Sequence, residues 1–260
     1  MSTTTAAHRI AAARETFRAL HARGCFVLAN PWDIGGVRRA EKLGYKAIAS
    51  TSAGFAWSLG RNDNEASRDE VLAHLTALCH STMLPVNADF EDGFAEQPEG
   101  VAENVRLAVA TGVAGLSIED RRGIDLYPIG PATERIRAAR QAIDRSGENV
   151  LLVGRSEGLL LGNTTIDTTV ERLIAYAAAG ADCVFAPGIR SITDIRSLVA
   201  AVAPTPVNVL LMDASMSVAE LAEAGVRRVS VGAAFAKAAW AAYEHAARSV
   251  IEAGHLPRGN

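Results

Sequence analysis

The sequence predicts an α/β protein that folds as a (β/α)₈ barrel, and three observations support this fold class. Short apolar runs alternate with longer amphipathic segments along most of the 260-residue chain, the pattern expected of parallel strands joined by helices. There are eight such runs, and eight strand-helix units usually close into a barrel. Most helical segments end at a glycine, such as Gly44, Gly112 and Gly180, a common helix stop.

The chain opens with helix-forming residues over 6–23 that end at Gly24. Because this helix precedes the first strand, we expect it to cap the barrel. Strands are then expected at 25–29, 47–51, 84–89, 115–119, 150–155, 183–187, 206–211 and 228–232. The intervening helices are expected at 34–43, 67–80, 100–111, 131–145, 166–179, 191–202, 217–224 and 233–253.

No linker or change of composition divides the chain, so we expect one barrel domain over residues 1–260. Its N-terminal capping helix lies within 1–24 and its C-terminal helix within 233–254. That last helix carries Trp240 and Tyr243, and it either packs against a neighbouring subunit or forms an ordinary outer helix. A doubly wound open sheet is the alternative fold, but the first strand is not followed by a G-x-G-x-x-G turn.

Composition and charge exclude several classes of partner. The net charge is −3 and no basic stripe is present, which argues against nucleic acid as a partner. No apolar run approaches the ~20 residues that span a membrane, and the start lacks the apolar region of a signal peptide. Cys25, Cys79 and Cys183 lie far apart, so neither a zinc site nor a disulfide framework is indicated. We expect a cytoplasmic protein.

Charged and amide side chains stand at the ends of several predicted strands. Burying an unpaired carboxylate is costly, so carboxylates at such positions indicate a polar site at the carboxyl ends of the strands. One arginine, Arg155, accompanies several acids. The candidates are Asn87, Asp89, Glu91 and Asp92 after the third strand, Glu119 and Asp120 after the fourth, Arg155 and Glu157 after the fifth, and Asn208 in the seventh.

Several of these residues also have plainer interpretations. For Asp89, Glu119 and Arg155 the alternative is a purely structural ion pair. Asp92 precedes a glycine and is typical of a turn. Asp120, with Arg121 and Arg122, is typical of a solvated loop. Glu157 is expected to orient Arg155. Asn208 is expected either to bind substrate or to satisfy backbone groups inside the barrel.

A second type of feature follows the second strand, where 50–54 carry short hydroxyl side chains and backbone N–H groups. These groups are able to hold a carboxylate or phosphoryl group, and a plain strand-to-helix turn is the alternative interpretation. The candidate ligands at the strand ends are hard oxygen donors without His or Cys. Such donors suit Mg²⁺, or Mn²⁺, better than zinc. The residues alone therefore predict a small anionic substrate beside a divalent cation.

Six segments together form a recognisable pattern by their order and spacing: 44–48, 58–67, Asn87-Ala88-Asp89, Ser117-Ile118-Glu119-Asp120, Gly154-Arg155-Ser156-Glu157 and 178–182. With these segments, the sequence from about Asn30 to Gly254 resembles the isocitrate lyase and phosphoenolpyruvate mutase superfamily. The resemblance implies a (β/α)₈ barrel whose last helix is exchanged between the subunits of a tetramer, with a dimer as the other possibility. It also implies a Mg²⁺ ion that holds an α-oxocarboxylate or its enolate.

The resemblance also implies roles for individual residues. Thr51, Ser52 and Ala53 correspond to the segment that grips the substrate carboxylate. Asp63 resembles an outer aspartate of the metal site, with Asn62 competing for that position. Arg155 resembles the arginine that neutralises developing negative charge on the substrate.

The metal ligands implied by the resemblance are Asp89 and Glu119, together with Asn87 at the first position of the family's usual Asp-x-Asp pair. An asparagine there removes one negative charge, which Glu91 or Asp92 is able to restore.

The loop after the fourth predicted strand departs from the family pattern. The lyase branch carries a Lys-Lys-Cys-Gly-His loop, whereas residues 120–128 are shorter and contain no cysteine. We therefore do not expect the usual isocitrate or methylisocitrate lyase mechanism, and Tyr127 is one candidate for proton transfer. The leading hypothesis is a Mg²⁺-dependent lyase or decarboxylase acting on a small α-oxo or 2-hydroxy acid through a pyruvate-like enolate. A mutase that forms or breaks a P–C bond and a non-catalytic, carboxylate-binding barrel are the alternatives.

Overall fold

Eight parallel strands form the central sheet of the computed structural model, which describes residues 3–257. Their order is β1-β10-β9-β8-β7-β4-β3-β2, and a bridge from Ala29 to Ile48 joins the two ends, so the sheet is nearly closed. The predicted barrel is confirmed. The strands are β1 (Phe26–Leu28), β2 (Ile48–Ala49), β3 (Val86–Asp89), β4 (Gly115–Glu119), β7 (Leu151–Arg155), β8 (Cys183–Phe185), β9 (Val207–Leu210) and β10 (Arg228–Ser230).

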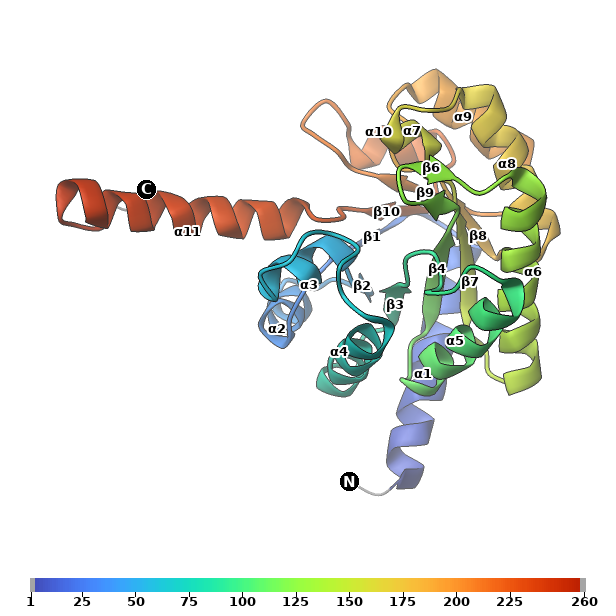
Figure 1. Cartoon of the computed structure of the whole chain (residues 1–260), viewed down its shortest axis with the longest axis horizontal. Helices are drawn as coiled ribbons and strands as arrows, with labels where there is room; N and C mark the ends of the chain where they lie inside the picture. Colours follow the sequence, from blue (N-terminus) through green and yellow to red (C-terminus); the bar gives the residue numbers. More distant parts are fainter. Residues whose placement is uncertain (1–2, 258–260) are drawn as a thin grey trace.

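Helices follow the strands and surround the barrel (Figure 1). Each of the nine predicted helical segments corresponds to an observed helix. The predicted domain limits at residues 1 and 260 lie outside the described residues. The helices are α1 (Thr3–Ala22), α2 (Ile34–Lys42), α4 (Arg68–Ser81), α5 (Pro98–Ala110), α6 (Ile129–Ser146), α8 (Ile166–Ala178), α9 (Ile192–Val202), α10 (Val218–Glu223) and α11 (Ala234–Ala253).

Four short elements were absent from the sequence prediction. They are the helices α3 (Ser52–Ser58) and α7 (Gly158–Leu161) and a hairpin of β5 (Arg121–Arg122) and β6 (Asp125–Leu126). None is long enough to show a periodicity of its own. The segment after β2 is therefore a helix start, and Thr51 caps it by accepting a hydrogen bond from the Gly54 N–H.

Helix α1 closes the end of the barrel where the strands begin. Phe17 of α1 is fully buried and packs with Phe26, Leu28 and Leu151. Arg14 fixes the helix by donating to the carbonyl oxygens of Val109 and Val113. The foot of the barrel is thus filled, and the opposite end, where the strands finish, is left for a site.

Helix α11 projects away from the barrel instead of lying against its side (Figure 1). Ala236 is its only buried residue, whereas Tyr243 and Ile251 are 66% and 84% exposed. It does not form the ordinary outer helix that the sequence left open.

None of the helices in residues 3–257 combines the length and apolarity that crossing a lipid bilayer requires.

Candidate active site

A cavity of about 360 Å³ opens at the carboxyl ends of the strands. Its wall includes Asp89 from β3, Arg155 from β7 and Ser230 from β10, with Trp57 and Lys237 contributed by helices. Thr51, Ser52 and Ala53, which the sequence assigned to substrate binding, also line it. Parallel strands bring their final residues to one edge, so side chains distant in sequence meet here.

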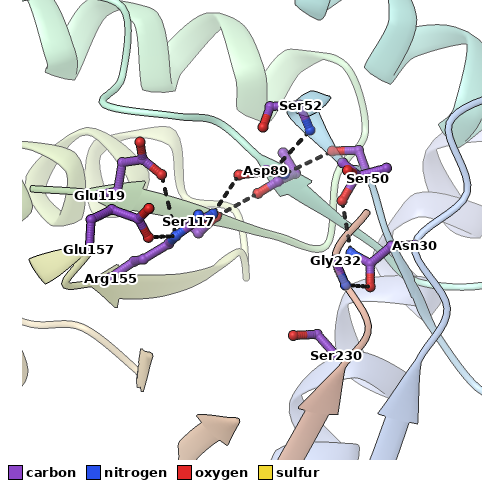
Figure 2. A network of polar contacts seen from close by, with 12 residues as sticks. Asn30, Ser50, Ser52, Asp89, Ser117, Glu119, Arg155, Glu157, Ser230 and Gly232 are labelled. Atoms are coloured by element: carbon purple, nitrogen blue, oxygen red, sulfur yellow. Dashed lines mark hydrogen bonds and ion pairs between the residues drawn. The ribbon is translucent and has the colours of Figure 1, made fainter. Parts of the chain in front are cut away.

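Arg155 lies in this wall among three carboxylates (Figure 2). Its Nη1 is 3.1 Å from Asp89 Oδ1, and its Nε is 2.5 Å from Glu157 Oε1 and 3.3 Å from Glu119 Oε2. Strand β7 pairs with β4 so that Arg155 stands opposite Glu119. The predicted meeting of Asp89, Glu119 and Arg155 at one mouth of the barrel is therefore observed, and Glu157 contacts Arg155 as expected.

The charges of this cluster do not balance. Burial disfavours the charge of Arg155, but Glu157, Glu119 and Asp89 outweigh that effect and raise the pKa of Arg155 well above its usual value. Burial raises the pKa of Glu119 well above its usual value, although Arg155 opposes the shift. One guanidinium cannot fully stabilise three carboxylates, of which Glu119 and Glu157 are buried and Asp89 is half-buried. The cluster is therefore short of positive charge.

Backbone and hydroxyl groups of the β2–α3 segment hold Asp89 in place. Its Oδ2 accepts a hydrogen bond of 3.0 Å from the Ser52 N–H, and its own N–H donates to Ser50 Oγ at 2.8 Å (Figure 2). Asn30 continues the network, because it donates to the Ser50 carbonyl and accepts from the N–H groups of Val231 and Gly232. Asp89 is consequently fixed between the start of α3 and Arg155.

Glu91 adds a further carboxylate to the same region. Its backbone has a positive φ of 48°, a conformation that is unfavourable for a non-glycine residue. Its Oε1 is buried without a hydrogen-bond partner among the described residues. Burial, followed by the charges of Asp89 and Asp63, raises the pKa of Glu91 to about 8. A buried, unsatisfied oxygen among like charges is the type of group that a cation would stabilise.

Asp63, rather than its neighbour Asn62, lies in the cavity wall. Asn62 instead binds Glu65 through both its backbone and side-chain nitrogens. Asp63 is at the exposed rim, yet its carboxylate faces the cluster, where burial and then the charge of Asp89 raise its pKa. Of the two candidates Asp63 and Asn62, Asp63 is therefore the one positioned at the cavity, and its role at a metal site stays a prediction.

The structure does not support Asn87 as a metal ligand. Asn87 is two residues before Asp89 on β3, so its side chain lies on the same face but deeper in the barrel. Its Oδ1 accepts from Arg228 Nη1 at 3.2 Å, and its Nδ2 donates to the Ala88 carbonyl. A guanidinium at Oδ1 repels a metal cation, so Asn87 belongs to a different part of the cavity from Asp89.

Asn208 is not among the residues that line the cavity. It is fully buried, accepts from Arg228 Nε at 2.9 Å and donates to Ser230 Oγ at 3.1 Å. Its predicted contact with substrate therefore does not fit the structure. The alternative expectation, that Asn208 satisfies backbone groups inside the barrel, is right about its interior position, but the hydrogen-bond partners of the Asn208 side chain are other side chains.

The interpretation of Asp120 as part of a solvated loop is wrong. Asp120 is 3% exposed and accepts hydrogen bonds from the Tyr176 hydroxyl at 2.6 Å, from Arg172 and from the Glu157 N–H. Both bonding side chains come from α8, more than 50 residues further along the chain. Asp120 therefore positions the segment that carries Glu157, and through it Arg155.

Tyr127 is absent from the cavity wall. It is 6% exposed, packs beneath the Arg135 guanidinium and donates to Asp92 at 3.4 Å. The structure thus gives no support to Tyr127 as a proton-transfer group. Sequence reasoning also missed Lys237 and Arg228, both of which line the cavity.

The residues present fit a hard divalent cation held largely through water. No three His, Cys, Asp or Glu side chains in the described part of the chain already converge as the ligands of a metal centre do. Mg²⁺, however, usually retains several waters and needs only one or two protein carboxylates. The unsatisfied Glu91 oxygen and the excess of negative charge at Asp89 and Glu119 match that requirement.

Comparison with known proteins adds a family to this geometry. The model of a family described as phosphoenolpyruvate phosphomutase matches residues 17–251. An uncharacterized protein of Mycobacterium tuberculosis is 32% identical over 94% of this chain and 92% of its own length. An oxaloacetate decarboxylase of Chromohalobacter salexigens is 30% identical over 72% of this chain and 67% of its own length.

Solved structures agree. A Burkholderia cenocepacia protein described as a candidate lyase or mutase superposes with a TM-score of 0.92 at 42% identity, covering 95% of this chain and 91% of that one. Oxaloacetate acetylhydrolase, solved with its product oxalate, gives a TM-score of 0.87 at 25% identity over 96% of this chain and 90% of that one. The relatives by sequence also include a 2-methylisocitrate lyase of Escherichia coli. The solved structures with this fold also include a 2,3-dimethylmalate lyase, described as a member of the PEP mutase/isocitrate lyase superfamily, and a phosphoenolpyruvate phosphomutase.

Proposed function

Since this chain belongs to the phosphoenolpyruvate phosphomutase family, whose superfamily comprises lyases and mutases, we propose that it is a Mg²⁺-dependent lyase or decarboxylase. Its substrate is a small α-oxo or 2-hydroxy acid, and the reaction passes through a pyruvate-like enolate. The observation that carries the proposal is Arg155 at the cavity wall beside Asp89 and Glu119. Oxaloacetate decarboxylase and the oxalate complex of oxaloacetate acetylhydrolase, as relatives, support this substrate class.

The proposed chemistry is electrostatic. In such a cleavage the bond between the carbon next to the carbonyl and the departing fragment breaks, the fragment leaves as CO₂ or as a second carbonyl compound, and the electron pair left on that carbon is delocalised onto the carbonyl oxygen as an enolate. Arg155, held by Glu157 and Asp89, is positioned to stabilise that oxygen without reorganising. Thr51, Ser52 and Ala53 would orient the substrate carboxylate beside it.

We propose that Asp89, Glu91 and Glu119 hold the Mg²⁺, directly or through water, with Asp63 as an outer carboxylate. Bound there, Mg²⁺ would polarise the carbonyl oxygen as a Lewis acid. Asn87 is not part of this set, because its oxygen is occupied by Arg228. Charge balance supports the assignment, since the carboxylates outnumber the single guanidinium of Arg155.

A P–C bond mutase is the second candidate. The family model that matches most of the chain is described as phosphoenolpyruvate phosphomutase, and the cavity carries Lys237 as well as Arg155 for a phosphoryl group. The two reactions share an enolate, so the same residues serve both.

Turnover assays separate these functions. Purified protein is given oxaloacetate, 2-methylmalate-type acids, isocitrate-type acids and phosphonopyruvate, with Mg²⁺ or with a chelator, and pyruvate or glyoxylate release is followed. We expect Mg²⁺-dependent cleavage of one of the carboxylic acids, which Arg155→Lys and Asp89→Asn each reduce at least about 100-fold.

Glu96→Gln and Arg122→Gln serve as matched controls, because that ion pair is about 60% exposed and lies outside the cavity wall. Phosphonopyruvate turnover without C–C cleavage would favour the mutase. Tight oxalate binding with no turnover of any substrate would instead indicate the non-catalytic barrel.

We also propose that α11 is covered by another copy of the chain, as the sequence resemblance implies. Its exposed apolar residues include Trp240, Tyr243 and Ile251, and a projecting apolar helix is unstable alone in water. Light scattering should give a dimer or tetramer, and Trp240→Glu with Ile251→Glu should shift the protein toward monomer. A wild-type monomer would contradict this proposal.

A further inference from the structure

The floor of the cavity contains a second arginine whose surroundings differ from those of Arg155. Arg228 begins β10, is 2% exposed and still lines the cavity. Its side-chain partners are two neutral amide oxygens, Asn208 Oδ1 at 2.9 Å and Asn87 Oδ1 at 3.2 Å. No carboxylate of the described residues forms an ion pair with it.

Such a cation is unusual, because a buried charge is normally paired. The groups that face Arg228 from neighbouring elements do not neutralise it. Asn208 and Cys183 lie on β9 and β8, Asn87 lies on β3, and His21 rises from α1 below. Burial therefore lowers the pKa of Arg228, but a guanidinium stays charged at neutral pH.

Hydrogen-bond donors remain free around this charge. Arg228 Nη2 has no partner among the described residues, whose hydrogen bonds to Arg228 involve Nε and Nη1 only. Ser230 Oγ accepts from Asn208, so its own proton is available to donate. Asn87 uses Nδ2 for one bond to Ala88 and keeps a second N–H. All three residues line the cavity.

We propose that Arg228, Asn87 and Ser230 form an anion subsite that takes the distal carboxylate of a dicarboxylate substrate. This inference rests on the proposed function, which places the oxo or hydroxy end of the substrate at Arg155. Asn87 and Asp89 are two residues apart on one face of β3, a separation of about 7 Å. Asp89 contacts Arg155 and Asn87 contacts Arg228, and both arginines line the same cavity, so a small diacid held at Arg155 would direct its distal carboxylate toward Arg228.

The subsite would select for charge at the far end of the substrate. A monocarboxylate of equal length would leave the guanidinium unpaired and place a methyl group among polar donors, which is unfavourable. A dicarboxylate supplies a charge-assisted, two-pronged partner of the kind that guanidinium favours.

Binding of matched ligand pairs tests the subsite. Calorimetry in Mg²⁺ compares oxaloacetate with 2-oxobutyrate and malate with 2-hydroxybutyrate. We expect wild-type protein to bind each diacid at least about 30-fold more tightly than its monoacid partner. Arg228→Met should reduce this preference to less than about threefold, through weaker diacid binding and unchanged monoacid binding.

Asn87→Asp is the second variant, in case Arg228→Met does not fold. It places a carboxylate where the Asn87 oxygen already contacts Arg228 Nη1. This carboxylate should form an ion pair with Arg228 in place of the substrate and also lower the diacid preference about 10-fold. Thr205→Ser is the control, because Thr205 precedes β9 and lies outside the cavity wall. It should leave the preference for diacids unchanged.

The outcomes separate this inference from the proposed function. A wild-type protein without any diacid preference, or one whose preference survives both variants, overturns the subsite even where turnover is found. A preference that depends on Arg228 in a protein that cleaves no substrate upholds the subsite and overturns the proposed function.

Discussion

Two arginines of one barrel lie in opposite electrostatic environments. Arg155, at the mouth, is surrounded by Asp89, Glu119 and Glu157. Arg228, on the floor, instead donates its side-chain hydrogen bonds within residues 3–257 to the amide oxygens of Asn87 and Asn208. The mouth therefore has an excess of negative charge and the floor an excess of positive charge. This difference indicates that the mouth requires a cation and the floor an anion, so each region is completed by a different ligand.

Replacing each of the two arginines in turn by a neutral residue tests this contrast most directly. Arg155→Met leaves buried Glu119 and Glu157 and half-buried Asp89 without their cation, and breaking such a buried pair typically costs about 3–5 kcal/mol of unfolding free energy. Activity should fall about 1000-fold or more. Arg228→Met removes a charge that has no acidic partner but leaves the Asn87 and Asn208 oxygens without their donor, so its loss of unfolding free energy should be smaller, about 1–3 kcal/mol. Urea denaturation at pH 7 measures both, and equal losses in the two variants would contradict the contrast.

The metal end is tested by comparing Glu91 with Asn87. Glu91→Gln removes a carboxylate beside Asp89 and Asp63, and the Mg²⁺ concentration for half-maximal activity should rise about 10- to 100-fold. Asn87→Asp adds a carboxylate, but one that pairs with Arg228, so Mg²⁺ affinity should not improve. A Mg²⁺ titration of both variants decides the matter. Tighter Mg²⁺ binding in Asn87→Asp would return Asn87 to the metal site.

A smaller effect on stability and activity is expected at Asp120, which holds the segment that carries Glu157 at the mouth of the barrel. Tyr176→Phe removes the 2.6 Å hydrogen bond to buried Asp120, which should cost about 1–2 kcal/mol in unfolding free energy. Since Asp120 also accepts from the Glu157 N–H, kcat should fall a few-fold while the diacid preference at Arg228 stays unchanged. Thermal denaturation and steady-state kinetics measure the two effects. A changed diacid preference would show that the two regions are not independent.

Most of the fold was predictable because its signals are local. All eight strands of the barrel were found, since each is an apolar run bounded by polar residues. The missed elements α3, α7 and the β5–β6 hairpin have between two and seven residues each. Caps and turns define such pieces, and periodicity does not reveal them.

The site was predicted only where a charge ends a strand. Asp89, Glu119 and Arg155 carry that signal, and the structure brings them together. Asp120 was misread because its partners Arg172 and Tyr176 come from a distant helix, which one sequence cannot reveal.

Arg228 was overlooked although a signal existed. In Arg228-Val229-Ser230-Val231 the polar residues alternate with valines, so both polar side chains share one face of the strand. In a closed barrel that face points inward. The metal, its ligands, the subunit number and the cytoplasmic location stay predictions.

The last prediction concerns His21, which lies beneath Arg228 at the foot of the barrel. Burial and then the charge of Arg228, with smaller contributions from Arg18 and Arg227, lower the pKa of His21 to about 3, and no acid offsets these cations. An unfolded histidine has a pKa near 6.5. Between these two pKa values His21 is protonated in the unfolded chain but neutral in the folded protein. The stability that His21 contributes above pH 6.5 is therefore lost as the pH falls toward 3. We expect a loss of about 1 kcal/mol between pH 7 and 5.5, measured by urea denaturation. His21→Leu should remove this loss, whereas Arg228→Met should leave it nearly unchanged between pH 7 and 5.5, because burial, the largest cause, still keeps the folded pKa below that window. If His21→Leu loses stability as steeply as wild type, His21 is not held neutral by burial and the nearby arginines, and another group accounts for the pH dependence.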